Sequence, residues 1–364
     1  MKNVNLNKIN WYALSLIAMV TLSTSSRVFS MDIFRAIITR YFMMDIFEAI
    51  ENNNIARVEE LVKDKSFNFY QVNSHDETPL HCACYKNNLA MVRLLLDSAC
   101  RKLGQSRAKE SVNKTTKDGW TPLHCACYQD NPDMVKLLFA NGAKKSVNIA
   151  NSYDWTPLFY ACNKNNLEIV RLLLDYACSE LGQSGLKEFV NKADNDGLTP
   201  LYCACYKNNL EMVKLLLPYC TKETINKANK YGETLIDYSC HENNLEMVRL
   251  LLEYGAKVDK WSIEKVQTNL RRPEKQAIAK QILNTLNLTQ RFDKWVKTGQ
   301  YFDLTKEEKN NIELKKFMGG LFKSKRAEIM QQENQINIFA FKSAPERDLV
   351  KEDKISDCRI RCLS

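Results

Sequence analysis

The stretch TPLHCAC at residues 78–84 recurs letter for letter at residues 121–127, and TPLYCAC follows at residues 199–205. Two weaker copies, TPLFYAC from Thr156 and TLIDYSC from Thr234, bring the number to five. The five threonines are separated by 43, 35, 43 and 35 residues. A regular period of this size is typical of repeat arrays, in which each repeat buries its apolar side only against its neighbours.

Each copy predicts a helix, a turn and a second helix. Threonine is a good helix N-cap, and proline suits the first helical turn, where its missing N–H costs nothing. An asparagine pair such as Asn87 and Asn88 then marks a turn, because asparagine tolerates the left-handed conformation that ends helices. The pair recurs at residues 165–166, 208–209 and 243–244. A stretch such as LAMVRLLLD from Leu89 follows, with apolar residues at helical spacing.

The two long repeats carry matching insertions that begin 78 residues apart. They read DSACRKLGQSRAKESVNK from Asp97 and DYACSELGQSGLKEFVNK from Asp175. We expect them to lengthen the second helix by about one to two turns on the outer side. The spacing leaves two interpretations open, a second contact surface or only a longer outer helix.

Thr-Pro-Leu-His followed by a pair of small residues, on a helix pair that recurs about every 33 residues or more, resembles the ankyrin repeat. The resemblance implies an all-α fold, an ankyrin-repeat α-solenoid of about six helix-turn-helix units with a smaller helical C-terminal region. The array covers residues 44–259, with units at about 44–73, 74–115, 116–150, 151–193, 194–228 and 229–259. The first unit lacks the Thr-Pro-Leu-His motif, and the last has lost its proline and histidine.

The paired cysteines are better explained by packing than by chemistry. Residues two apart on a helix point about 200° apart, so Cys82 and Cys84 cannot chelate one ion together. Cysteine otherwise behaves as a small buried hydrophobe. The resemblance further implies that His81 and His124 tie each turn to its neighbour through hydrogen bonds. We therefore expect no catalytic residue, no cofactor, no metal site and no small-molecule substrate.

The resemblance also implies where a protein partner binds. Ankyrin repeats bind proteins through the turn tips and the exposed side of the first helix, here called the inner helix. Tryptophan and tyrosine, the usual anchors of interfaces, are concentrated at these positions. The predicted partner-binding residues are Tyr85, Lys86, Lys117, Trp120, Tyr128, Tyr153, Trp155, Tyr206, Lys207 and Tyr231. The alternative for the tryptophans is that they pack onto neighbouring turns.

The C-terminal region, residues 260–343, is basic and predicted to be helical. Residues 259–364 hold 22 Lys and Arg against 15 Asp and Glu, most of the net charge of +9. We expect two helices around Pro273, a capping box from Thr305 to Glu308, and a break at Gly319 and Gly320. The basic segment 315–326 could touch a membrane or nucleic acid, but a solvated helix with a buried apolar side is the favoured interpretation. Residues 344–364 are predicted to be disordered.

The first 30 residues have the layout of a secretory signal peptide. Lys2 and Lys8 precede a 12-residue apolar run, residues 11–22, and small polar residues follow, with cleavage expected after Ser30. The alternative is a later start at Met31 or Met44, which makes the protein cytoplasmic. An odd count of 13 cysteines placed in helical patterns indicates reduced thiols. Export together with reduced thiols indicates a bacterial protein delivered into a host cytosol, similar to exported ankyrin proteins of intracellular bacteria.

Two functions follow from the sequence. The first is an adaptor, possessing no catalytic activity, that binds a partner protein through its repeats. The second is an enzyme whose array selects the substrate and whose C-terminal region carries an unrecognised activity. No nucleophile–base pair or phosphate-binding loop is visible in that region, so the adaptor is favoured.

Overall fold

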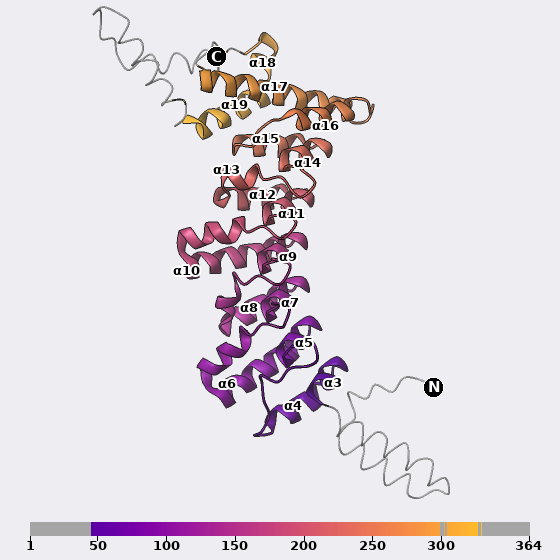
Figure 1. Ribbon diagram of the computed structural model, residues 1–364, viewed down its shortest axis with the longest axis vertical. Coiled ribbons are helices and arrows are strands. Elements are labelled where there is room, and N and C mark those ends of the chain that lie inside the picture. The colour runs from indigo at the N-terminus through magenta and orange to yellow at the C-terminus, as the bar shows by residue number, and fades with distance from the viewer. Residues whose placement is uncertain (1–44, 299–301, 303, 327–328, 330–364) are drawn as a thin grey trace, which may run out of the picture. The chain divides into compact units, whose positions relative to one another are not determined.

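The computed structural model describes residues 45–298, 302, 304–326 and 329. The predicted signal peptide, the alternative starts at Met31 and Met44, and the predicted tail at residues 344–364 lie outside the described residues. The chain divides into two compact units, Met1–Phe189 and Val190–Ser364, which we call unit 1 and unit 2. Within the described residues all regular structure is helical, as the sequence predicts (Figure 1).

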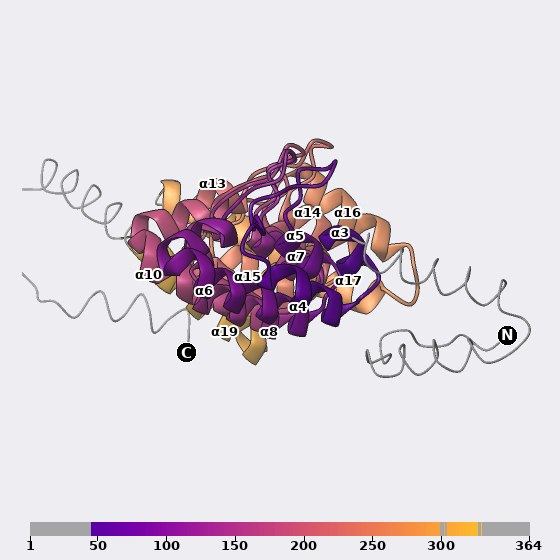
Figure 2. The same cartoon turned by 90° about the horizontal axis from the view of Figure 1, so that it is seen from below.

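Unit 1 is built from helix pairs. Its elements are α3 (Ile46–Glu51), α4 (Ile55–Lys63), α5 (Pro79–Tyr85), α6 (Leu89–Val112), α7 (Pro122–Tyr128), α8 (Pro132–Ala140), the 3-10 helix η2 (Ala143–Ser146), α9 (Pro157–Asn163) and α10 (Leu167–Asn191), which ends just inside unit 2. The short inner helices α3, α5, α7 and α9 pack side by side, and α4, α6 and α8 form a second layer behind them. The loops that precede α5 and α7 project to one side of this stack (Figure 2).

Unit 2 continues the same plan and then departs from it. Its repeat elements are α11 (Pro200–Tyr206), α12 (Leu210–Leu216), η3 (Leu217–Tyr219), α13 (Lys222–Ile225), α14 (Leu235–His241) and α15 (Leu245–Glu253). Four further helices follow, α16 (Lys260–Leu270), α17 (Gln276–Thr298), α18 (Lys306–Asn310) and α19 (Ile312–Ser324).

The predicted helix starts are confirmed. Thr78, Thr121, Thr156, Thr199 and Thr234 each cap an inner helix, and each side chain accepts a hydrogen bond from the backbone N–H three residues on. The leucine and the small residues that follow each cap are buried, for example Leu123, Ala126 and Cys127 at 0% exposure. The core of each unit is therefore the apolar side of these inner helices packed against the outer layer.

The turn between the two helices of a repeat is held by asparagine in two ways. Asn87 has a positive φ of 54°, and Asn165, Asn208 and Asn243 adopt the same left-handed conformation, as predicted. The asparagine that follows this left-handed residue caps the outer helix. In the next repeat it is Asn131, which accepts from the Met134 N–H at 2.9 Å. The Asn131 amide also donates to Asn87 Oδ1 in the turn of the preceding repeat, at 2.6 Å. This link between neighbouring turns was not foreseen from the sequence.

The insertions form helical hairpins rather than simple extensions of the outer helix. The run of helix in α6 is broken at Gly104 (φ 75°, ψ 163°), and that in α10 is broken 78 residues later at Gly182 (φ 64°, ψ −175°). Only glycine adopts this backbone region readily. The chain therefore turns back at each glycine, and the returning segment of α6 buries Ala108 and Val112.

Gly182→Ala is expected to lower the free energy of unfolding by about 1–3 kcal/mol, since alanine is strained in that backbone region. A Cβ at Gly182 would meet no atom within 4 Å, so strain rather than a clash is the cause. Urea denaturation measures the change. Gln105→Ala, at an exposed position of the other hairpin, is the control and should be near neutral. An equal response of the two variants would contradict the strained kink.

Helices α16 and α17 pack directly on the last repeat. Buried Ser262 donates its hydroxyl to Asp237 Oδ1 of α14 at 2.7 Å, and Asn269 donates its amide to the carbonyl of Cys240 at 2.8 Å. The predicted helix pair around Pro273 is confirmed, and so is the capping box from Thr305 to Glu308. This helix pair covers the apolar end that α14 and α15 would otherwise expose.

The predicted break at Gly319 and Gly320 is wrong. Both glycines lie inside α19, and the break falls at Asn311, which ends α18 and caps α19. Gly320 lies close to Glu253, since a Cβ there would lie 2.6 Å from the carboxyl carbon, at the end of a flexible side chain. Phe317, Met318 and Leu321 are buried, so the apolar side of the basic segment 315–326 faces the protein. In the described part of the chain no helix has the length and apolarity to cross a membrane.

Candidate partner-binding surface

The inner helices of unit 1 are fixed to one another by the two motif histidines. Nδ1 of His124 lies 3.1 Å from the Thr121 N–H, which donates to it, and 2.8 Å from the Thr121 hydroxyl. A ring nitrogen that accepts from an N–H carries no proton, so Nε2–H is the donor to the Trp155 carbonyl at 3.1 Å. His81 repeats this arrangement with Thr78 and the Trp120 carbonyl. The predicted ties between neighbouring turns are therefore present.

The turn tip that carries Tyr153 and Trp155 is also fixed. Asn151 Oδ1 accepts from the N–H groups of Tyr153 and Trp155, both at 3.0 Å. The Asn151 amide donates to the Tyr160 hydroxyl at 3.1 Å. Ser152 N–H donates to the Asp118 carbonyl at 2.9 Å, which joins this tip to the preceding one. The tips therefore present their aromatic rings on a fixed backbone.

Aromatic rings form a continuous band across three successive repeats of unit 1. Tyr85 stacks on Tyr128 with a centroid distance of 6.0 Å and an interplanar angle of 5°. Trp120 lies 5.7 Å from Tyr128 and 5.0 Å from Tyr160, measured between ring centroids. Trp155 lies 5.4 Å from Tyr160, and Tyr153 lies 5.5 Å from Trp155. We call these residues the aromatic inner surface: Tyr85, Trp120, Tyr128, Tyr153, Trp155 and Tyr160.

The rings differ in their exposure. Tyr85 and Tyr153 are 47% and 58% exposed, whereas Trp120, Tyr128 and Trp155 are half-buried among the other rings. The tryptophans thus pack onto neighbouring rings and still reach the surface. Buried Tyr160 is the residue that sequence reasoning missed, although its place in TPLFYAC, where other repeats have cysteine, was visible.

Lysines surround this aromatic surface. Lys86 is exposed and pairs with Glu51 at 2.7 Å, and Lys117 is exposed at a turn tip. Lys164, at the inner-helix position equivalent to Lys86, places its ammonium 4.5 Å from the centroid of the Tyr128 ring. A cation at this distance is attracted by the ring face. The unit 1 residues of the prediction therefore gather into one surface.

The three remaining predicted residues lie in unit 2. Tyr206 is 57% exposed, and its ring lies 5.5 Å from that of Tyr238. Lys207 is exposed, with its ammonium 5.7 Å from the Tyr206 ring centroid. Tyr231 is 74% exposed at a turn tip. Tyr206 and Tyr238 thus form a ring pair on α11 and α14, and Tyr231 lies on the turn tip that precedes α14; with Lys207 we call these residues the second aromatic group.

A protein-family model described as ankyrin repeats (three copies) matches residues 46–105, 99–182 and 174–260, together more than half of the chain. The chain belongs to the ankyrin repeat family. No curated protein matches the sequence. Among solved structures, the ankyrin repeat domain of Bcl-3, described as a unique member of the IkappaB protein family, is 22% identical to the chain. That match covers 61% of this chain and 97% of the Bcl-3 chain, with a TM-score of 0.46.

The cysteines of the ankyrin motif are core residues. Cys84, Cys127 and Cys162 are fully buried, and burial raises the pKa of the Cys84 thiol well above its ordinary value. Burial likewise raises the pKa of Cys82 and of Cys203 to about 12. Among the described residues no group of three or more His, Cys, Asp or Glu side chains is placed to hold a metal ion. These thiols fill space where the helices approach closely.

Thiol labelling of the native protein is expected to separate two classes of cysteine. The exposed Cys100 and Cys178 should react quickly with a maleimide or disulfide reagent. The motif cysteines should react only at the rate of local or global opening, because a buried thiol with a raised pKa is a poor nucleophile. Peptide mapping by mass spectrometry assigns each site, and fully denatured protein provides the control. Rapid labelling of Cys84 or Cys127 would contradict their place in the core.

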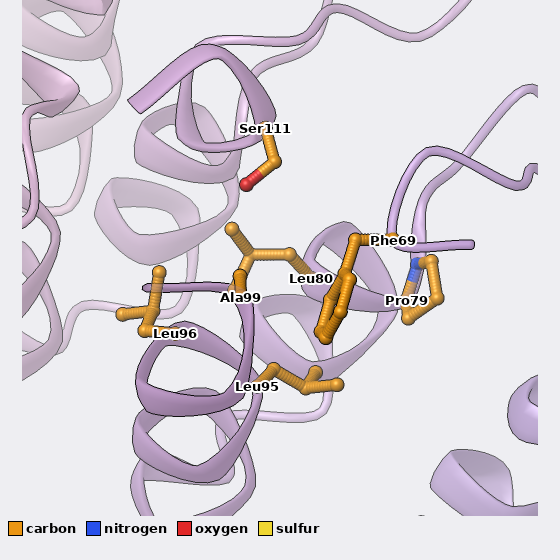
Figure 3. Close-up of a pocket in the computed structure, with 7 residues that line it drawn as sticks. All are labelled: Phe69, Pro79, Leu80, Leu95, Leu96, Ala99 and Ser111. Atoms are coloured by element: carbon orange, nitrogen blue, oxygen red, sulfur yellow. The ribbon is translucent and has the colours of Figure 1, made fainter. Parts of the chain in front are cut away.

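The described pocket of unit 1 does not compete with this surface. It lies between the loop before α5 and the two halves of α6, and Phe69, Pro79, Leu80, Leu95, Leu96, Ala99 and Ser111 line it (Figure 3). Ser111 is its one polar side chain, and the hydroxyl already donates to the Ala108 carbonyl at 2.7 Å. With no titratable group, the pocket offers packing and no acid–base chemistry.

Proposed function

We propose that this ankyrin repeat protein is an adaptor that binds a partner protein on the aromatic inner surface of unit 1, without catalysis of its own. The second aromatic group provides a further contact in unit 2. The family supports the general role, since ankyrin repeats are protein-interaction scaffolds. The geometry of the aromatic rings supports this position for the partner site.

The observation that carries the proposal is the band of rings from Tyr85 to Tyr153. Aromatic side chains bury a large area at a low cost in conformational entropy, so they often supply most of the binding energy. Here hydrogen bonds within the turn tips and from the motif histidines already hold the backbone in place. The repeat surface therefore loses little further conformational entropy when a partner binds. A folded scaffold presents these rings at the surface although burial would be more favourable for them.

The test is the affinity of a captured partner for matched variants. Tyr85→Ala with Tyr153→Ala removes the two most exposed rings of the surface and leaves the buried Tyr160 in place. We expect a loss of affinity of at least about tenfold, since interface aromatic residues commonly contribute 2 kcal/mol or more. Tyr254→Ala is the control, because Tyr254 is an exposed tyrosine at the end of the outer helix α15. An equal loss in both variants, or none, would place the binding site elsewhere.

We also propose that the protein is an exported effector, secreted through residues 1–30 and delivered to a reducing cytosol. The cysteines support the second half of this proposal, because exposed Cys100 and Cys178 and buried Cys84 and Cys127 are free thiols. N-terminal sequencing of the mature protein tests the first half. A chain that begins at Met31 in the secreted fraction supports cleavage after Ser30. An intact Met1, or a chain that begins at Met31 or Met44 in the cytoplasmic fraction, would contradict it.

A further inference from the structure

Unit 2 concentrates positive charge on the helix pair beyond the repeats. Residues 260–298 contain nine Lys and Arg but only three acidic residues. Four of the cations, Arg271, Arg272, Lys275 and Lys280, lie at the α16–α17 turn and the first turn of α17, and Glu274 is the one acid among them. Such a density of one sign attracts counter-charged surfaces.

The α16–α17 turn is held in a fixed position. Asn243 donates its amide to the Lys275 carbonyl at 3.1 Å, and Asn269 donates to the carbonyls of Cys240 and His241. Within the turn, the Arg272 N–H donates to the Asn269 carbonyl at 3.0 Å. The cations therefore project from an ordered backbone anchored to the last ankyrin repeat.

The four cations are not neutralised by the described protein around them. None of them has an ion pair within the described residues, in contrast to Lys265, which pairs with Glu233, and Arg291, which pairs with Glu308. Glu274 is the acid of the turn itself, and on the packed helices Glu242 of the α14 end contacts His241 at 3.0 Å and Glu246 lies in the first turn of α15. Ile278 stands in the same stretch with 43% of its surface exposed.

We propose that Arg271, Arg272, Lys275 and Lys280 form a basic docking surface for an anionic phospholipid membrane. Clustered Lys and Arg bind acidic headgroups electrostatically. This surface is separate from the aromatic inner surface of unit 1. It would bring the adaptor and its partner to a membrane without a spanning helix.

The side chains of this cluster favour a lipid surface over nucleic acid. Single-stranded nucleic acid binds where aromatic rings alternate with cations, so that bases can stack. No aromatic residue occurs between Arg271 and Lys280, where the exposed apolar residue is an isoleucine. The segment 315–326 cannot serve in the same way, because its apolar side chains are buried.

The test is sedimentation of the full chain with vesicles of phosphatidylcholine containing phosphatidylserine, beside vesicles of phosphatidylcholine alone. We expect binding to the anionic vesicles that weakens with added salt. The quadruple variant Arg271→Gln, Arg272→Gln, Lys275→Gln and Lys280→Gln should partition at least about tenfold less. The control removes the same charge from four exposed lysines of unit 2, by Lys227→Gln, Lys257→Gln, Lys306→Gln and Lys316→Gln, and should bind nearly as the parent does.

Three results would overturn the proposal. The first is equal binding to both kinds of vesicle, which residues 11–22 could produce. The second is equal binding by the quadruple variant and its control. The third is that the parent protein does not bind the vesicles but binds an oligonucleotide, and that the quadruple variant does not. That result would assign the surface to nucleic acid. Circular dichroism of every variant confirms that the fold is retained, and the aromatic inner surface is intact in all of them.

Discussion

His124→Ala is expected to lower the free energy of unfolding by about 2–4 kcal/mol, because one change removes both the side-chain half of the α7 capping box that His124 supplies and its tie to the next repeat. His124 is fully buried, and its ring contacts the Thr121 N–H, the Thr121 hydroxyl and the Trp155 carbonyl. Alanine would leave the buried Thr121 N–H without its acceptor and would remove one of the two donors to the Trp155 carbonyl, which also accepts from the Asn151 N–H. Urea denaturation, followed by circular dichroism, measures the loss.

The exposed histidine at the end of α14 provides the matched control for this variant. The exposed His241 ring contacts the neighbouring Glu242 carboxylate, so His241→Ala should change the stability by less than about 0.5 kcal/mol. If the His124 variant were as stable as the His241 variant, the proposed role of the motif histidines in joining the repeats would be wrong.

Acid is expected to destabilise the array through the same two histidines. Burial lowers the pKa of His81 and of His124 from 6.5 to about 4, with the Trp120 and Trp155 carbonyls acting weakly in the opposite direction. Between these values the unfolded chain binds a proton that the folded chain does not, so falling pH favours unfolding. Their contribution is complete above pH 6.5 and disappears towards pH 4. The loss is on the order of 3 kcal/mol for each histidine.

The pH dependence is measured as the free energy of unfolding at a series of pH values from 7 to 4.5. His124→Gln, which cannot titrate, removes one of the two contributions and should flatten the curve by about one proton. Carboxylates titrate in both proteins, so the difference between parent and variant isolates the histidine. Parallel curves for the two proteins would contradict the neutral, buried state of His124.

The repeat fold could be predicted because its turns depend on residue type. Threonine caps and asparagine in the left-handed conformation are local requirements, so Thr78, Thr121 and Asn87 identify their own positions. The hairpin kinks were missed for a related reason. Gly104 and Gly182 occur in helical patterns, and glycine there is compatible with both a continued helix and a turn. Whether the helix continues or turns back depends on whether the segment after the glycine can bury its apolar residues, as Ala108 and Val112 do.

The C-terminal helices show where local signals fail. Gly319 and Gly320 predict a break, yet the helix α19 continues through them, with Phe317, Met318 and Leu321 buried around them. No repeat motif predicts the packing of α16 on α14, because it depends on Asp237 and Ser262, two buried polar residues far apart in sequence. The spacing of residues along the chain does not reveal such long-range pairs.

The residues of the candidate surface were predicted, but the contacts between their rings were not. Repeat register placed Tyr85, Tyr128 and Trp155 on one side of the array, because equivalent positions share a face. The ring contacts depend on Tyr160, which occupies a position where three other repeats have cysteine. A buried ring of that size supports its exposed neighbours, so the packing explanation for the tryptophans and their proposed part in binding are compatible.

Site-specific photo-crosslinking tests the adaptor proposal most directly. A photoreactive phenylalanine analogue replaces Tyr153 on the aromatic inner surface in one protein and Tyr254 on the outer helix α15 in another. Both positions are exposed tyrosines, so each substitution is tolerated. If a partner binds on the aromatic inner surface, we expect one protein from a cell lysate to crosslink at Tyr153 and not at Tyr254. We also expect Tyr85→Ala to weaken this crosslink. A partner that crosslinks only at Tyr254, or equally at both, would contradict binding on the aromatic inner surface.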